Sequence, residues 1–299
     1  MDILLVCIVI FLLIINFLFT RQYYPNKDVL NFQSLESNLQ ILAIGSGPGR
    51  FDINFSDIPH AKNLCVWPQD FRYDYRMIKY YRHHFCKEAV IIHAISPLAF
   101  TENIYSKDAL IDRNYVKVLP PDSIDLSTQN YFLEKYIPAF KHPKELIKYI
   151  LGIERKFTAE GDKNVLADNF IKGWLSTNPH LKNFKDPSQD ESMKYAFENN
   201  KYWLTKMIDF CDKENLHYVP LIVPMGTHLK SYFSKEFLDV FLYKNIYESG
   251  IKKNDIIDCL SCRELENDEL YYNGLFLNDV GSNIMTNIIL KSLKEVSRI

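Results

Sequence analysis

Apolar residues along the chain form short runs of strand length, separated by stretches in which apolar side chains recur every three or four residues. The strand-length runs lie at 40–44, 63–67, 89–95, 218–223 and 255–258, and the helical patterns at 74–85, 192–215 and 281–299. The first pattern is typical of buried strands, and the second places apolar side chains on one face of a helix. Strands that alternate with helices predict an α/β fold with a doubly wound, mainly parallel sheet. Asp279 is the expected N-cap of the last helix.

The N-terminus carries a long apolar run, residues 3–19, which only Asn16 interrupts. At about 1.5 Å per residue this run is long enough to cross most of a bilayer core, so residues 1–20 are predicted to be a transmembrane anchor. A cleaved signal peptide and a buried soluble helix are the alternatives, but the run has no basic start, no small-residue cleavage site and no polar face. Arg21 and Lys27 follow the run, and the positive-inside rule then favours a cytoplasmic domain.

Residues 21–38 are predicted to be a linker, and residues 39–299 to be one α/β domain. Within that domain, residues 101–190 differ from the rest because they combine proline-containing polar stretches with two helical patterns, at 130–151 and 163–175. We interpret this stretch as an insertion. Such segments commonly overhang the carboxyl ends of the strands, where open α/β sheets bind ligands.

Charge and cysteine content exclude some functions. The 35 basic and 37 acidic residues give a net charge of −2 without a long run of either sign, so the chain has no electrostatic footprint for nucleic acid. Cys259 and Cys262 have the spacing of a redox pair or of half a zinc site, but no second such pair accompanies them. Two ordinary thiols or a short-range disulfide are preferred, and no metal site is predicted.

The stretch "ILAIGSGPGR" places Gly45, Gly47 and Gly49 directly after a predicted strand. Glycines at this point are typical of a nucleotide or S-adenosylmethionine loop, in which backbone amides face the ligand. A dinucleotide fold also needs a helix after the loop and an acidic residue at the end of the second strand. The sequence supplies neither clearly, because few residues precede Pro59 and the second strand ends at Trp67. A nucleotide- or S-adenosylmethionine-dependent enzyme stays open as an alternative, although no cofactor is predicted.

Five stretches along residues 40–295 resemble, in order, motifs of the SGNH (GDSL-like) hydrolase superfamily. They read "GSGPG", "NLCVWPQDFRYDY", "VIIHAIS", "LIVPMGTHLKSY" and "NGLFLNDVG". With the preceding anchor, the chain is similar to membrane-anchored SGNH-like proteins of bacterial envelope polysaccharide biosynthesis. This resemblance implies a three-layer, flavodoxin-like α/β domain on the extracytoplasmic side of the cell membrane, in conflict with the charge bias around the anchor.

The resemblance also assigns catalytic positions. It places the serine nucleophile at Gly47, the aspartate at Asn273 and the histidine at Phe276, and none of these residues can play the corresponding role. The chain is therefore expected to be a catalytically inactive partner or glycan-binding element in the assembly or acylation of a surface polysaccharide. Its partners would be a membrane acyltransferase or a glycan, and the resemblance points to Asn63 and Gln69 as ligand-binding residues.

One catalytic alternative remains at the neighbouring Ser46. An O-acyl esterase or acyltransferase with a rearranged triad would use this hydroxyl, with a base among His60, His93, His217 and His228. Because adjacent residues at a strand end point to opposite faces, Ser46 is expected to point away from the position of Gly47. A turn hydroxyl bonded to nearby backbone is the simpler interpretation.

Overall fold

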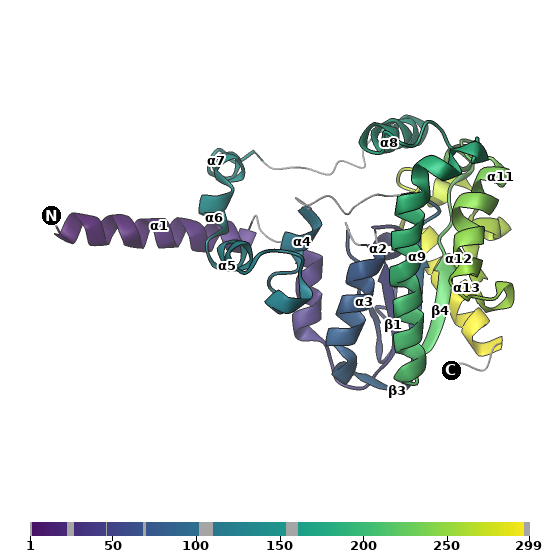
Figure 1. Ribbon diagram of the computed structural model, residues 1–299, viewed down its shortest axis with the longest axis horizontal. Helices are drawn as coiled ribbons and strands as arrows, with labels where there is room; N and C mark the ends of the chain where they lie inside the picture. Colours follow the sequence, from purple (N-terminus) through teal and green to yellow (C-terminus); the bar gives the residue numbers. More distant parts are fainter. Residues whose placement is uncertain are drawn as a thin grey trace. The chain divides into compact units, whose positions relative to one another are not determined.

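The computed structural model describes residues 2–22, 27–45, 47–67, 70–101, 110–153 and 161–295 (Figure 1). Contacts between residues divide the chain into two compact units. Unit 1 combines Met1–Ser34 with Lys107–Thr158, and unit 2 combines Leu35–Ser106 with Ala159–Ile299. The stretch interpreted as one insertion therefore contributes to both units.

Unit 2 is built on a five-stranded sheet in the order β2-β1-β3-β4-β5, and every strand pair in it is parallel. The strands are β1 (Leu39–Gly45), β2 (Ala61–Asn63), β3 (Phe85–Ile95), β4 (His217–Ile222) and β5 (Ile257–Asp258). The register places Gly45 beside Ala94 and Ile222 beside Asp258, so the carboxyl ends of these strands meet at one edge. The predicted α/β class with a mainly parallel sheet is confirmed.

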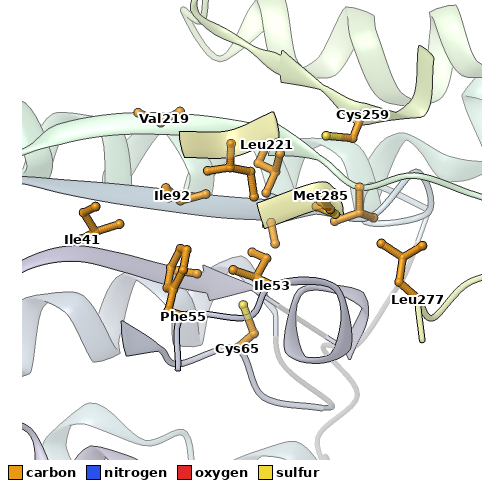
Figure 2. Close-up of a cluster of buried hydrophobic side chains, with 14 of the residues drawn as sticks. Ile41, Ile53, Phe55, Cys65, Ile92, Val219, Leu221, Cys259, Leu277 and Met285 are labelled. Carbon is orange, nitrogen blue, oxygen red and sulfur yellow. The ribbon is translucent and has the colours of Figure 1, made fainter. Parts of the chain in front are cut away.

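The main core of unit 2 lies between the sheet and helix α13 (Asp279–Glu295). Alternate residues of the central strands point into it, as the period of a strand requires. Figure 2 shows Ile92, Val219 and Leu221 of the sheet in one cluster with Ile53 and with Met285 of α13. Each such side chain contributes about 1.5–3 kcal/mol when it is fully buried. Burial on this scale anchors the C-terminal helix to the sheet.

The other helices of unit 2 connect the strands and surround the sheet (Figure 1). Helices α3 and α9 contact each other and contact β1 and β4, respectively. Phe184, Phe233, Phe237 and Phe241 form a stack of rings around α11. The helices are α2 (Gly47–Asp52), α3 (Phe71–Tyr80), α8 (Lys163–Thr177), α9 (Asp190–Lys213), α10 (Thr227–Lys230), α11 (Lys235–Leu238) and α12 (Lys244–Glu248).

Two predicted boundaries in unit 2 differ from the structure. The second strand was expected at 63–67 but is β2, Ala61–Asn63. Hydrogen bonds to β1 nevertheless continue past it, because the Val66 amide donates to the Gly45 carbonyl over 3.0 Å. At the start of α13, Asn278 rather than Asp279 is the cap, since its Oδ1 accepts the amides of Val280 and Gly281 at 3.1 Å. An amide side chain fills this role as well as a carboxylate does.

Unit 1 contains α1 (Asp2–Gln22), α4 (Leu110–Asn114), α5 (Thr128–Tyr136), α6 (Pro138–Lys141) and α7 (Pro143–Ile150). Within the described residues, Ile3–Thr20 of α1 is one stretch long and apolar enough to cross a membrane, with a mean hydropathy of 3.1. Most of its side chains are exposed, which is the opposite of a helix in a soluble core. The N-terminal run is thus an apolar helix long enough to cross a membrane, and its role as an anchor stays a prediction.

Candidate functional site

The strand order of unit 2 points to one place on the sheet. The order 2-1-3-4-5 is the flavodoxin-like order of doubly wound sheets, in which ligands bind outside the carboxyl ends of the strands where the winding direction reverses. Here the reversal lies between β1, which ends at Gly45, and β3, which ends at Ile95. Both the glycine-rich turn and the segment before α13 lie at this edge, as the next contacts show.

Packing accounts for each of the three glycines after β1. Gly45 has a φ of +126°, and a side chain there would meet the Ala94 carbonyl. A Cβ at Gly47 would lie 2.9 Å from Cδ1 of Trp67, and one at Gly49 would lie 2.7 Å from Sγ of Cys65. Helix α2 follows directly and has 6 residues. The turn therefore brings the backbone of α2 close against β3 and Trp67.

The structure describes Asn63 but neither Ser46 nor Gln69, the other two residues predicted to act at the site. Asn63 lies at the end of β2, and its Nδ2 donates to the carbonyls of Gly49 at 2.9 Å and Ile53 at 2.7 Å. Its Oδ1 accepts the Cys65 amide at 3.0 Å, so these bonds fix the α2 turn. A ligand-binding role for Asn63 stays a prediction. Ser46 and Gln69 lie outside the described residues.

The segment before α13 contacts α2. Asn273 turns the chain, because its Oδ1 accepts the amides of Leu275 at 3.2 Å and Phe276 at 3.0 Å. The Phe276 ring is buried against Phe51 of α2, with ring centroids 4.8 Å apart. Phe51 belongs to α2, the helix that begins at Gly47, so the segment before α13 lies against the helix that follows the glycine-rich turn. The assignment of Gly47, Asn273 and Phe276 to triad positions stays a prediction.

Asp52 of α2 is hydrogen-bonded to the same segment. Its Oδ1 accepts the Leu277 amide at 2.8 Å, while its Oδ2 has no hydrogen-bond partner among the described residues. Burial raises the pKa of this carboxyl well above its usual value, although the Leu277 hydrogen bond acts in the opposite direction. A protonated carboxyl removes the cost of a buried charge. Asp52 therefore links α2 to the C-terminal segment through its hydrogen bond to the Leu277 amide.

The other side of this segment contacts α10 and α8. The Gly226 amide donates to the Gly274 carbonyl over 2.8 Å, and a Cβ at Gly274 would lie 3.1 Å from Leu229 and 3.4 Å from Ala167. Gly226 follows the end of β4, and Ala167 belongs to α8. The loop from Tyr271 to Leu277 is consequently enclosed by α2 on one side and by α10 and α8 on the other.

A partly exposed polar cluster stands beside that loop. His228 Nε2 of α10 lies 2.8 Å from Asp168 Oδ1 of α8, and the Tyr232 hydroxyl donates to the same oxygen over 2.6 Å. The His228 amide also points at the Asp268 carboxylate, 3.3 Å away. Hydrogen bonds from Tyr232 and His228 lower the pKa of Asp168, and the same contact raises the pKa of Tyr232. The ionised carboxylate thus orients the imidazole.

The structure separates the four histidines that the sequence left as candidate bases. His60 directly precedes β2 and His217 begins β4, so both lie at the amino ends of strands. His93 is fully buried in β3, between Asp74 Oδ2 at 3.0 Å and the Tyr218 hydroxyl at 2.8 Å. His228 follows the carboxyl end of β4 and is partly exposed, whereas His93 lies two residues before the end of β3 and is fully buried. The position of His228, soon after a predicted parallel strand, can be recognised in the sequence. Its partner Asp168 cannot, because it lies sixty residues away.

A buried ion pair begins α3 and was not anticipated from the sequence. Asp70 caps the helix by accepting the Tyr73 amide at 2.8 Å, and its Oδ2 pairs with Arg72 at 3.2 Å. Burial raises the pKa of Asp70 to about 6, while the Arg72 charge partly offsets that rise. A buried carboxyl with a raised pKa thus lies at the helix start that follows Gln69.

The Cys-x-x-Cys pair lies at the end of β5. Both cysteines are free thiols; Cys259 is buried in the main core, and Cys262 is partly exposed. Their mutual hydrogen bond raises the pKa of Cys259 and lowers that of Cys262. Within the described part of the chain, no group of three or more His, Cys, Asp or Glu side chains is arranged to hold a metal ion. Cys262 Sγ donates to the Asp258 carbonyl over 3.4 Å, and the pair consists of two free thiols.

Comparison with known proteins does not assign the chain to a family. No protein-family model matches the sequence, and no curated protein matches it significantly.

Proposed function

We propose that this protein is a membrane-tethered α/β protein that binds a cell-envelope glycan at the carboxyl edge of its sheet without hydrolysing it. One observation carries the proposal. Phe276, where the resemblance requires a histidine, packs against Phe51 of α2, the helix that begins at Gly47. Asn273, where it requires an aspartate, is engaged by the backbone amides of its own turn. The helices around the sheet are compatible with the three-layer SGNH arrangement.

The chemistry of these positions excludes the resembled mechanism there. Gly47 has no nucleophile, and the ring of Phe276 has no lone pair to accept a proton. The Asn273 oxygen accepts two backbone amides and carries no charge to stabilise an imidazolium. Acyl transfer by a Ser-His-Asp arrangement at this place would need all three roles.

Features that suit a glycan surround the same place. Trp67 packs against Gly47 and is 49% exposed, so an indole surface faces outward at this edge. A sugar ring has an apolar face of C–H groups that packs on an aromatic ring and hydroxyls that need hydrogen-bond partners. His228, Asp168 and Tyr232 supply such partners on the far side of the loop from Tyr271 to Leu277. A membrane acyltransferase that modifies the glycan is the partner this function implies.

The proposal predicts that Trp67→Ala weakens binding of an immobilised O-acetylated envelope polysaccharide about tenfold, or ~1.4 kcal/mol. Binding is measured by surface plasmon resonance with the full chain in detergent. Tyr80→Ala is the matched control, because Tyr80 is a similarly exposed aromatic residue at the opposite end of α3. Binding by the control and loss in Trp67→Ala supports the proposal. Equal binding by Trp67→Ala and the parent, or no saturable binding by the parent, contradicts it.

A second candidate, an O-acyl esterase or acyltransferase that uses Ser46, is favoured by the His228–Asp168 contact. A histidine held by a carboxylate at the carboxyl edge is the orientation that a general base needs. The nucleotide or S-adenosylmethionine alternative is less well supported, because packing accounts for Gly45, Gly47 and Gly49. Release of acetate from an ester distinguishes this enzyme from a protein that binds the glycan without hydrolysing it.

A further inference from the structure

Unit 1 carries an exposed apolar surface that the anchor helix alone does not explain. Between residues 128 and 153, large apolar side chains point outward from α5, α6, α7 and the turn that follows. They are Phe132, Tyr136, Ile137, Phe140, Ile147, Ile150, Leu151 and Ile153. Large apolar side chains exposed together in one segment are typical of a contact with a membrane or another molecule. We call this segment the α5–α7 platform.

The platform is attached to the C-terminal part of α1. Asn16 Nδ2 donates to the Tyr136 carbonyl over 2.6 Å, and its Oδ1 accepts the Ala139 amide at 3.2 Å. Three residues later, Phe19 is fully buried against Ala139 and meets the Tyr149 ring edge-on at 5.9 Å. The one polar residue that interrupts the apolar run therefore satisfies the backbone where α5 meets α6.

Helix α7 has two apolar faces, of which one is used within unit 1. Leu146 and Tyr149 pack toward Phe19 and Ala139. Ile147, Ile150 and Leu151 follow the spacing i, i+3, i+4 and form a separate stripe, with Ile150 62% and Leu151 66% exposed. Packing against α1 thus fixes which face of α7 points outward.

The level of the platform along α1 matches the surface of a bilayer that α1 spans. Asn16 lies four residues, about 6 Å, before Thr20, where the apolar stretch ends. Amphipathic helices at a membrane surface bury their apolar face about 5–10 Å deep. In Figure 1, α5 and α7 are drawn nearly end-on while α1 lies lengthwise, so both run across the axis of α1. Helices that cross a spanning helix lie along the membrane plane.

Charge on the platform suits anionic lipid. Residues 128–153 contain four lysines and two glutamates. Glu134 is buried and pairs with Lys141 and His142 at 2.8 Å, so it is withdrawn from the surface. Lys144 is exposed on α7, the helix that carries the apolar stripe. Basic residues beside exposed apolar and aromatic side chains are typical of helices that bind anionic membrane surfaces.

We propose that the α5–α7 platform is a second membrane contact, which inserts its exposed apolar side chains into the leaflet at the C-terminal end of α1. This inference rests on α1 spanning the bilayer and is independent of whether the carboxyl edge of unit 2 binds a glycan. The occupant of the apolar surface is lipid with anionic headgroups. Unit 1 would then contact the membrane through two elements, α1 and the platform.

Tryptophan fluorescence of the full chain in vesicles of phosphatidylcholine and phosphatidylglycerol tests this proposal. Ile150→Trp reports on the platform, Phe11→Trp on α1 and Tyr195→Trp on an exposed position of α9, each as a difference from the parent protein. We expect lipids brominated near the headgroup to remove most of the emission added by Ile150→Trp. Lipids brominated deep in the acyl chain should quench Phe11→Trp, and neither should quench Tyr195→Trp.

Three results would overturn the proposal, and they have different meanings. Quenching of Ile150→Trp by aqueous iodide instead of bromolipid would place the platform in water. Emission that is blue-shifted, insensitive to bromolipid and dependent on the ratio of protein to lipid would mean that a second copy of the chain covers the surface. Failure of Phe11→Trp to respond would show that α1 does not span the bilayer. Ile147→Glu combined with Ile150→Trp should restore iodide access if lipid is the occupant.

Discussion

Gly45→Ala is expected to lower the free energy of unfolding by about 3 kcal/mol, because backbone strain and a steric clash add together. Gly45 ends β1 with a φ of +126°, which side chains of L-residues rarely adopt. A Cβ would also press on the carbonyl oxygen of Ala94 in the neighbouring strand and lie 3.1 Å from its Cβ. Neither backbone can move without breaking the pairing of β1 with β3. Denaturant unfolding of the full chain in detergent measures the loss.

Gly173→Ala is the matched control for that substitution. Gly173 lies within α8, and a Cβ there would meet nothing within 4 Å. Alanine at such a helix position is expected to stabilise by about 0.5–1 kcal/mol. If Gly45→Ala unfolded at the same denaturant concentration as the parent, the close approach of β1 to β3 would be wrong. The glycine-rich turn would then need a ligand to explain it.

Asp74→Ala is expected to destabilise unit 2 by about 3–5 kcal/mol, the cost of removing one partner of a buried pair. The Asp74 carboxylate and His93 are buried and lie 3.0 Å apart between α3 and β3. The far side of the His93 ring meets the Tyr218 hydroxyl, whose pKa burial raises well above its usual value. Without Asp74, the imidazole keeps a buried polar nitrogen that has lost this partner.

Two further substitutions serve as controls for Asp74→Ala. Tyr218→Phe removes one neutral hydrogen bond and should cost about 1 kcal/mol. Asp209→Ala removes an exposed carboxylate from α9 and should change stability by less than about 0.5 kcal/mol. If Asp74→Ala behaved like Asp209→Ala, the contact between Asp74 and His93 would not contribute to the fold. A large loss of stability in Asp74→Ala would also indicate that the fully buried His93 has a structural role.

Strands and long helices could be predicted because their signals are local. The apolar runs at 40–44 and 89–95 fall within β1 and β3, and the run at 218–223 extends one residue past the end of β4. The periodic stretch at 192–215 overlaps α9 closely. The error at β2 has a physical cause. Leu64, Cys65 and Val66 are buried like strand residues although the strand has ended, and Cys65 packs near Gly49 of α2. Hydrophobicity reports burial rather than backbone conformation.

The candidate site was accessible from the sequence only where spacing carried information. Gly47, Asn273 and Phe276 follow from motif order and stay a prediction, while the structure adds that Phe276 contacts Phe51 of α2. Asp52 gave no sequence signal, because its role depends on the Leu277 amide 225 residues away. The pair of His228 and Asp168 depends on how α8 returns to the sheet. Contacts between distant segments are set by tertiary packing, which local patterns do not encode.

The division into units also changes the meaning of the predicted insertion. Residues 107–158 belong with the anchor helix, whereas α8 belongs with the sheet and brings Asp168 to His228. A single stretch of sequence thus serves two purposes. One part supports the proposed membrane contact and the other supplies a side chain at the carboxyl edge. Composition distinguished this stretch from the rest of the domain but not its two halves.

Ester hydrolysis tests most directly whether the carboxyl edge binds without catalysis. The full chain in detergent is incubated with an O-acetylated envelope polysaccharide and, separately, with a chromogenic acetyl ester, beside Ser46→Ala and His228→Ala. We expect acetate release by all three proteins to equal that of buffer. Release by the parent that disappears in both Ser46→Ala and His228→Ala would contradict the proposed function and identify a rearranged catalytic site.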